Sequence, residues 1–336
     1  MSSPHRESAP AVAFFGSDAI ALPLLRALFD GKAWRLAGVV TQPDRPKGRG
    51  KTLQPNPIGA AAEGMGTTVL KPAKPGRALR EWLVAEGVQW ALVMAYGHIL
   101  GPRLLATLDG RFLNFHASVL PKFRGASPVE SAVATGQRET GVSLMQIVAA
   151  MDAGPVADLE TVPIGPEDTA GDVRERLAAA CVPLLERNLP RALAGNLTFS
   201  EQNHAHATFC RKLSKEDGQL DFHAPAAELV ARINGLYPWP GCFVDVGPTR
   251  LKVAHARVLN APAQTAALPP PGTVGALGDH GLPVACGDGW LAIGHLQKPG
   301  GRLLPAREFV RGFRLPEPPC FRSAPMTSLL VPPPTT

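Results

Sequence analysis

The sequence predicts an α/β protein with two domains, in which a doubly wound sheet is followed by a smaller β-barrel. Three observations support this fold class. The chain has 336 residues, which is long for one domain. Apolar strand-like runs alternate with helical patterns up to residue 194. After residue 208 the pattern changes to short alternating strands with a single clear helix.

The first domain is expected over residues 11–194. A buried strand at 11–15 leads through a turn at 16–18 into a helix at 20–28. The turn is interpreted as structural, because the dinucleotide pattern G-x-G-x-x-G is absent and a nucleotide-dependent oxidoreductase is therefore disfavoured. Pro183 and Pro190 are expected to kink or divide the last helix. The other expected strands are 36–41, 68–70, 90–95, 111–116, 141–147 and 156–162, and the other helices 58–65, 77–86, 127–135 and 169–194.

The second domain is expected over residues 208–316, after a polar linker at 195–207. Several short strands and one helix within about a hundred residues are typical of a small barrel such as an OB-fold. Residues 1–10 and 317–336 are expected to be a disordered leader and tail. The expected strands are 218–222, 242–246, 250–259, 273–277, 282–286 and 290–296, and the helix is 226–235.

Composition narrows the class of protein. A net charge of +6 and a pI near 9.2 permit a polyanionic partner without requiring one. The five cysteines are scattered, odd in number and never spaced as Cys-x-x-Cys, which indicates buried thiols in a reducing compartment and no zinc site. No apolar run approaches the roughly 18 to 20 residues of a membrane span. We expect a cytoplasmic monomer without a metal ion.

Residues 42–57 form an expected exposed basic loop. Four prolines prevent a regular helix, and the basic residues outnumber the single acid, Asp44. Such a loop is either a solvated connection or an arm that contacts the phosphates and unpaired bases of RNA. The basic residues are Arg45, Lys47, Arg49 and Lys51.

The strand at 111–116 carries the candidate catalytic side chains. Residues two apart on a strand share a face, so Asn114 and His116 point the same way. An amide donor beside an imidazole on rigid backbone is suited to hold a developing oxyanion. Asp152, on a turn followed by Gly154, is placed to orient the imidazole. The alternative is that these side chains only satisfy buried backbone and cap a turn.

At these residues the chain resembles the folate-dependent formyltransferases. Asn114, His116, the Ser118-Val119-Leu120-Pro121 turn and the Met151-Asp152-Ala153-Gly154 turn follow their ordered signature. Four further segments are similar to the members that act on methionyl-tRNA, namely residues 41–51, 95–97, 139–142 and 212–216. Val119, Phe115 and residues 153–155 depart from the usual pattern, which concerns the shape of the pterin pocket more than the catalytic side chains.

The resemblance implies a Rossmann-like formyltransferase fold with an OB-like C-terminal domain that binds tRNA. It implies transfer of formyl from 10-formyltetrahydrofolate to the α-amino group of methionyl initiator tRNA, for translation initiation, with Asn114, His116 and Asp152 catalytic. Arg49 is expected to reach the first base pair, supported by Arg45, Lys47 and Lys51. The folate contacts that it implies are Ala95, Tyr96, Gly97, Ser118, Val119, Leu120 and Pro121.

Other functions fit part of this pattern. A formyltransferase acting on a sugar nucleotide or a purine precursor shares the three catalytic side chains, and water is a possible side acceptor. The basic loop and the β-rich second domain favour tRNA over those acceptors. A catalytically silent RNA-binding module would bind tRNA with strong salt dependence but without turnover.

Overall fold

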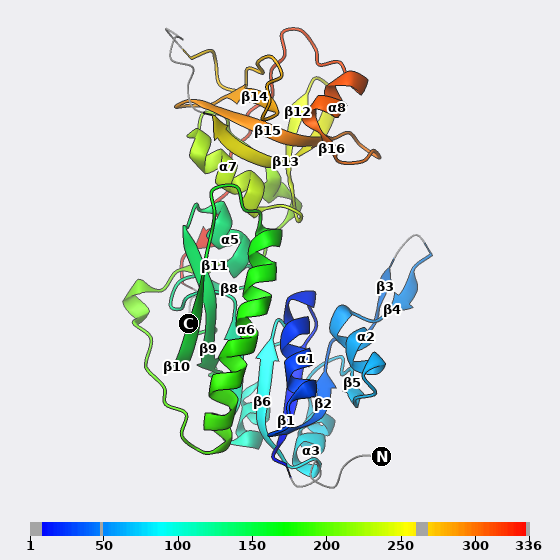
Figure 1. The fold of residues 1–336 in the computed structure, drawn as a ribbon, viewed down its shortest axis with the longest axis vertical. Helices are drawn as coiled ribbons and strands as arrows, with labels where there is room; N and C mark the ends of the chain where they lie inside the picture. The colour runs from blue at the N-terminus through cyan, green and yellow to red at the C-terminus, as the bar shows by residue number, and fades with distance from the viewer. Residues whose placement is uncertain (1–8, 48–49, 260–267, 334–336) are drawn as a thin grey trace. The chain divides into compact units, whose positions relative to one another are not determined.

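The structure is a computed structural model that describes residues 9–47, 50–259 and 268–333. The chain forms two compact units (Figure 1). The first contains Met1–Arg124, Gly141–Val162 and Glu175–Ala207, and the second contains Gly125–Thr140, Pro163–Arg174 and Thr208–Thr336.

The first unit is built on a seven-stranded sheet, which confirms the predicted doubly wound α/β domain. The strand order is β10-β9-β7-β6-β1-β2-β5, with β1 parallel to both β2 and β6. The chain adds β2 and β5 on one side of β1 and then returns to its other side with β6. Ligands collect at such a switch point, outside the carboxyl ends of the strands. The strands are β1 (Ala11–Gly16), β2 (Arg35–Val40), β5 (Val69–Leu70), β6 (Val88–Met94), β7 (Phe112–His116), β9 (Glu139–Gln146) and β10 (Val156–Pro163).

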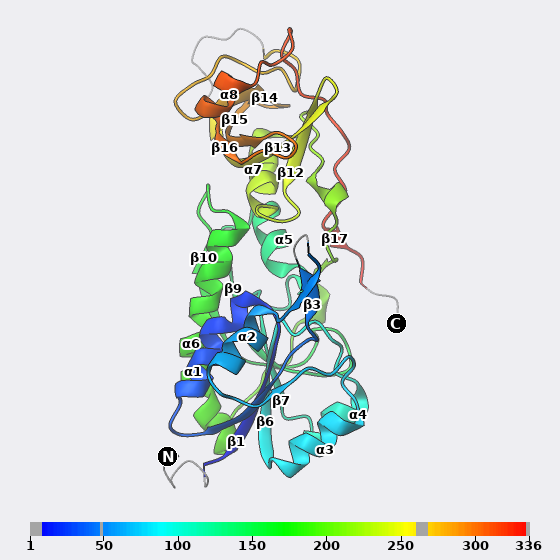
Figure 2. The same ribbon diagram turned by 90° about the vertical axis from the view of Figure 1, so that its right-hand side faces the viewer.

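Helices cover both faces of this sheet (Figure 2). Helices α3 (Arg77–Ala85) and α4 (Pro102–Leu105) pack on one face, where Phe15 and Leu83 share a buried cluster. Helices α1 (Leu22–Asp30) and α6 (Ala170–Leu193) lie on the other face, where Trp90 Nε1 donates a 3.1 Å hydrogen bond to Ala192 O. Helix α2 (Pro57–Gly64) begins after Asn56, whose side chain accepts from Gly59 N.

Helix α6 is a single helix of 24 residues and is not divided at its prolines. A proline inside a helix costs about 3 kcal/mol. Here that cost is offset by burial of the apolar face, because Leu177, Cys181 and Leu184 are all inaccessible to solvent.

The second unit is an antiparallel half-barrel around its own core, as the sequence predicted. Its strand order is β12-β13-β15-β14, with β16 added to β15. Helix α5 (Pro128–Ala134) packs against helix α7 (Ala226–Gly235), and a Cβ on Gly235 would lie 2.3 Å from the Ala134 nitrogen. The remaining elements are β12 (Cys242–Val246), β13 (Thr249–Leu259), β14 (Leu282–Ala285), β15 (Trp290–Gln297), β16 (Leu304–Pro305) and α8 (Ala306–Gly312).

The prediction of two strands in this unit was wrong. The segment 218–222 follows the 3-10 helix η5 (Lys215–Gly218), which a capping box from Ser214 and Asp217 closes. The segment 273–277 makes only isolated bridges, one of them between Val274 and Val284. Side-chain hydrogen bonds of the capping box precede the first segment, and single backbone bridges hold the second, so neither forms the continuous hydrogen-bond ladder of a strand.

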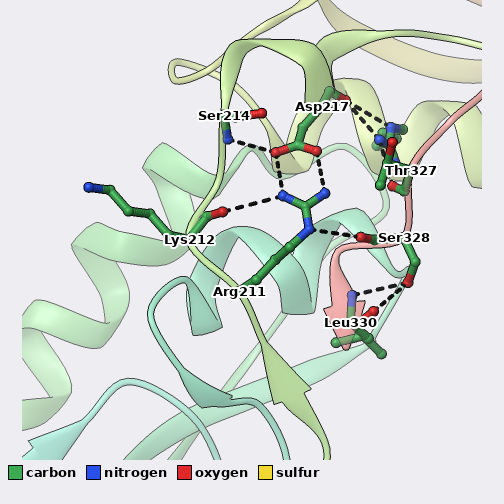
Figure 3. A network of polar contacts seen from close by, with 8 residues as sticks. Arg211, Lys212, Ser214, Asp217, Thr327, Ser328 and Leu330 are labelled. Atoms are coloured by element: carbon green, nitrogen blue, oxygen red, sulfur yellow. Dashed lines mark hydrogen bonds and ion pairs between the residues drawn. The ribbon is translucent and has the colours of Figure 1, made fainter. Parts of the chain in front are cut away.

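The expectation of a disordered tail was wrong for residues 317–333. Phe321 and Leu329 are buried, and β17 (Leu330–Val331) pairs with β11 (Phe209–Cys210). Arg211 Nε donates to Ser328 O at 3.1 Å, and its guanidinium also binds the Asp217 carboxylate (Figure 3). The apolar side chains therefore find places in the core of the second unit that composition alone did not indicate. Residues 1–8 and 334–336 lie outside the described residues.

Candidate active site

Strand β7 presents Asn114 and His116 near its carboxyl end, beside β6 and β9. Val93 pairs with Asn114, and His116 pairs with Ser143. His116 is buried, whereas Asn114 is half-buried. Among the described residues the Asn114 side chain makes no hydrogen bond, so its amide is available to a ligand. The shared face expected from the strand period agrees with this placement.

The two nitrogens of the His116 ring both face acceptors. Nε2 lies 3.0 Å from the carbonyl oxygen of Phe123, and Nδ1 lies 3.7 Å from Asp152 Oδ1. A carbonyl oxygen only accepts, so Nε2 carries a proton. The other ring nitrogen, Nδ1, faces the Asp152 carboxylate, which can only accept when it is ionised. The 3.7 Å separation between Nδ1 and Oδ1 is longer than a hydrogen bond, so the pair is an electrostatic contact in this structure.

Asp152 sits on a turn with unusual backbone geometry. Its φ is +50°, a left-handed conformation that few residues other than glycine adopt. Gly154, two residues later, approaches β9 so closely that an added Cβ would lie 2.0 Å from Gln146 O. The turn therefore holds the Asp152 carboxylate, whose side chain is 18% exposed, in one place beside His116.

The segment from Ser118 to Pro121, predicted to contact folate, is a braced loop. Ser143 Oγ donates to Ser118 O at 2.8 Å and accepts from Leu120 N at 3.0 Å. The side chains of Ser118 and Leu120 are buried, which leaves Val119 and Pro121 half-buried. Ser143 was not singled out in the sequence, although a serine between the apolar residues Val142 and Leu144 of a buried strand is a usable signal.

The second predicted folate segment follows β6. Ala95 and Gly97 are exposed, but Tyr96 is 2% exposed. Its ring packs edge-on against the ring of Phe15, with the two ring centroids 5.5 Å apart. Burial raises the pKa of Tyr96 to about 12. The Tyr96 side chain belongs to the core, so only its backbone faces the strand ends, where its carbonyl accepts from Gln42 Nε2 at 2.9 Å.

The basic segment forms a short hairpin where an irregular loop was expected. Strands β3 (Arg45–Lys47) and β4 (Thr52–Gln54) are antiparallel, because the extended backbone permitted by the prolines allows them to pair. Arg45, Lys47 and Lys51 are exposed, and Arg49 lies outside the described residues. At the hairpin base Lys71 Nζ lies 2.7 Å from Asp44 Oδ1 and from Glu63 Oε1, and hydrogen bonds to these carboxylates raise the pKa of Lys71.

A cleft of about 260 Å³ lies between this hairpin and the ends of β1, β2 and β6. Most of the residues that line it have polar side chains, and a side-chain network that the sequence did not reveal shapes the cleft. Asn56 Nδ2 donates to Gln42 O, and Arg45 Nη2 donates to Gln42 Oε1 at 2.5 Å. The lining includes Ser17, Asp18, Gln42, Arg45, Lys47 and Ala95.

Two global features bear on the chemistry. Within residues 9–47, 50–259 and 268–333, no three His, Cys, Asp or Glu side chains gather as metal ligands would. Over the same residues, no helix combines the length and apolar character that crossing a bilayer requires.

The comparison with known protein families matches both units in order. Residues 11–189 match the formyl transferase family model, and residues 212–314 match the formyl transferase C-terminal domain. A methionyl-tRNA formyltransferase from Methylobacterium sp. (strain 4-46) is 39% identical over 309 residues, covering 90% of this chain and 96% of the relative. The chain is a member of the methionyl-tRNA formyltransferase family.

Further relatives agree with this membership. The methionyl-tRNA formyltransferase of Sorangium cellulosum is 39% identical over 300 residues, which is 89% of this chain and 95% of that protein. Among solved structures, an N-formyltransferase from Helicobacter canadensis, in complex with folinic acid and dTDP-3-aminofucose, has a TM-score of 0.65 at 17% identity, covering 85% of this chain and 98% of that chain. At that identity the likeness concerns the fold, which is the formyltransferase fold.

Proposed function

We propose that the protein transfers the formyl group of 10-formyltetrahydrofolate to the α-amino group of methionyl initiator tRNA. The observation that carries the proposal is the pairing of His116, two residues along strand β7 from Asn114, with Asp152, whose carboxylate lies 3.7 Å from Nδ1. Family membership gives this pairing its chemistry, because the curated relatives are methionyl-tRNA formyltransferases. The product is N-formylmethionyl-tRNA.

The proposed reaction forms one C–N bond and breaks another. The methionyl amine attacks the formyl carbon, and the carbonyl oxygen becomes an oxyanion. The Asn114 amide and the His116 imidazolium donate to that oxygen; removing one such donor costs about a hundredfold or more in rate. The formyl donor supplies an activated one-carbon group, so the chemistry requires no redox change.

Asp152 has two roles in this proposal. Its carboxylate stabilises the positive charge on His116, and it receives the proton that the attacking amine loses, directly or through a water. As the C–N10 bond breaks, that proton passes to N10. The amine thus loses one proton and N10 gains one, which leaves the charge of the enzyme unchanged over the cycle.

Donor and acceptor are assigned to different parts of the first unit. The folate donor is proposed to lie against Ala95, Gly97, Val119 and Pro121, with the backbone of Tyr96, Ser118 and Leu120 setting the shape of the pocket. The exposed cations of the hairpin are proposed to bind tRNA phosphates, with Arg49 at the first base pair. The OB-like C-terminal domain is proposed to supply the remaining tRNA contacts, in a cytoplasmic monomer divided near residues 195–207.

The test is a formylation assay with charged initiator tRNA, beside free methionine and uncharged tRNA as acceptors. Formylation of the charged tRNA alone is expected. Transfer to a sugar nucleotide or to water, without tRNA formylation, would contradict the proposed acceptor while leaving the folate donor in place.

A further inference from the structure

A buried amide, Gln202, connects the Asp152 turn to a buried cation. Gln202 is 8% exposed and lies 50 residues after Asp152, in the segment that the sequence had indicated to be a polar linker. Its Nε2 donates to Asp152 O at 2.9 Å and to Gly154 O at 2.7 Å. Both protons of one amide are thus used on two carbonyls of the same catalytic turn.

The other end of the Gln202 amide is held by Arg124. Arg124 Nη2 donates to Gln202 Oε1 at 2.7 Å, and Nε donates to the same oxygen at 3.2 Å. Arg124 Nη2 also lies 2.9 Å from His204 Nδ1, which must accept because a guanidinium has no lone pair to offer. The orientation of the amide is therefore fixed: its oxygen faces donors and its nitrogen faces acceptors.

Arg124 adds charge as well as geometry. Its side chain is buried, and burial lowers the pKa of its guanidinium while the nearby Asp152 carboxylate raises it. Arg124 is 4% exposed as a residue, and its guanidinium contacts Gln202 and His204, so it is poorly placed to bind a substrate phosphate. These contacts favour a structural role for Arg124 as a clamp on the Gln202 amide.

We propose that Gln202 is a positioning residue, which holds the left-handed Asp152 turn so that the carboxylate faces His116. A non-glycine residue in that conformation costs about 1–3 kcal/mol and persists only where its surroundings determine it. The two hydrogen bonds from Gln202 hold the turn in this conformation, although Gln202 contributes no atom to the reacting centre. This inference rests on the proposed role of Asp152.

Two substitutions remove the hydrogen bonds that Gln202 donates to the turn. Gln202→Met keeps the length of the side chain but removes all its hydrogen bonds. Gln202→Glu keeps an acceptor for Arg124 but removes both donors to the turn. Each is expected to lower kcat by about 10- to 100-fold, since a misplacement near 1 Å can cost about a hundredfold. KM for the charged tRNA is expected to stay unchanged, because the hairpin is untouched. The matched control is Glu201→Gln, in which the neighbouring exposed side chain changes and kcat stays at the wild-type value.

A second readout does not depend on turnover. Hydrogen exchange of peptides covering residues 150–156 is expected to be faster in both Gln202 variants, with the melting temperature near that of the wild type. Lower kcat with local exchange confined to this turn supports the inference. Faster local exchange with unchanged kcat, or a loss of activity fully explained by a smaller folded fraction, overturns it. Wild-type protein inactive toward methionyl-tRNA, but with the same exchange response, would refute the proposed function and leave the positioning of the turn standing.

Discussion

Substituting Gly154 by alanine tests whether the active site depends on the exact course of the Asp152 turn. An alanine Cβ would lie 2.0 Å from Gln146 O and 3.1 Å from the carbonyl carbon. Real Cβ atoms essentially never come within 3.0 Å of another heavy atom, so the turn must move away from β9 by about 1 Å. The obstructing atoms are backbone, which cannot rotate aside as a flexible side chain would.

The displacement has two expected consequences. Overpacking of this kind costs about 1–3 kcal/mol in the free energy of unfolding. The shift of Asp152 away from His116 lowers kcat by about a hundredfold. Steady-state formylation and thermal unfolding measure these two effects. A matched control is Gly64→Ala at the end of α2, where an added Cβ meets no atom within 4 Å. Wild-type kcat in the Gly154 variant would refute the reasoning.

Three further predictions concern other parts of the chain. Burial by itself raises the pKa of Asp217. The hydrogen bonds from Arg211 and from Ser214 N lower this pKa by more than burial raises it, so the pKa in the folded protein lies below the usual value. Asp217→Asn is therefore expected to lower the free energy of unfolding by about 3 kcal/mol at neutral pH. In urea unfolding, the difference in this free energy between variant and wild type should disappear as pH falls below about 4. A difference that does not depend on pH would contradict this. Arg45→Ala and Lys47→Ala are each expected to raise KM for tRNA and to reduce the slope of log K against log salt by about 1, while KM for folate stays fixed; an unchanged slope would remove the hairpin from the tRNA interface. Because the buried Tyr96 hydroxyl has no hydrogen-bond partner among the described residues, Tyr96→Phe is expected to leave KM for folate unchanged and to raise the melting temperature slightly; weaker folate binding would show that this hydroxyl contacts the ligand.

Local patterns in the sequence were sufficient for the framework of the site. The strand period placed Asn114 and His116 on one face, and alternation of strands and helices gave the doubly wound sheet. Helix α7 was predicted with the bounds that the structure shows. These features depend on neighbouring residues, which a linear pattern records.

Features that depend on distant contacts were missed or misjudged. Gln202 reaches Asp152 across 50 residues, and nothing near Gln202 in the sequence distinguishes it from a solvated linker. Tyr96 was expected to face folate, but which way a side chain points after a strand end is decided by packing against Phe15. Phe321 and Leu329 lie in a segment with the composition of a disordered tail, yet they bury in the core of the second unit.

The central claim is that His116 acts on the transferred formyl group of a tRNA-linked substrate. The most direct measurement is single-turnover formylation of methionyl initiator tRNA by wild type and His116→Ala, with folate and tRNA binding measured in parallel. We expect transfer to be lost in the variant while both ligands bind with near wild-type affinity. Formylation by the variant at the wild-type rate would contradict the account.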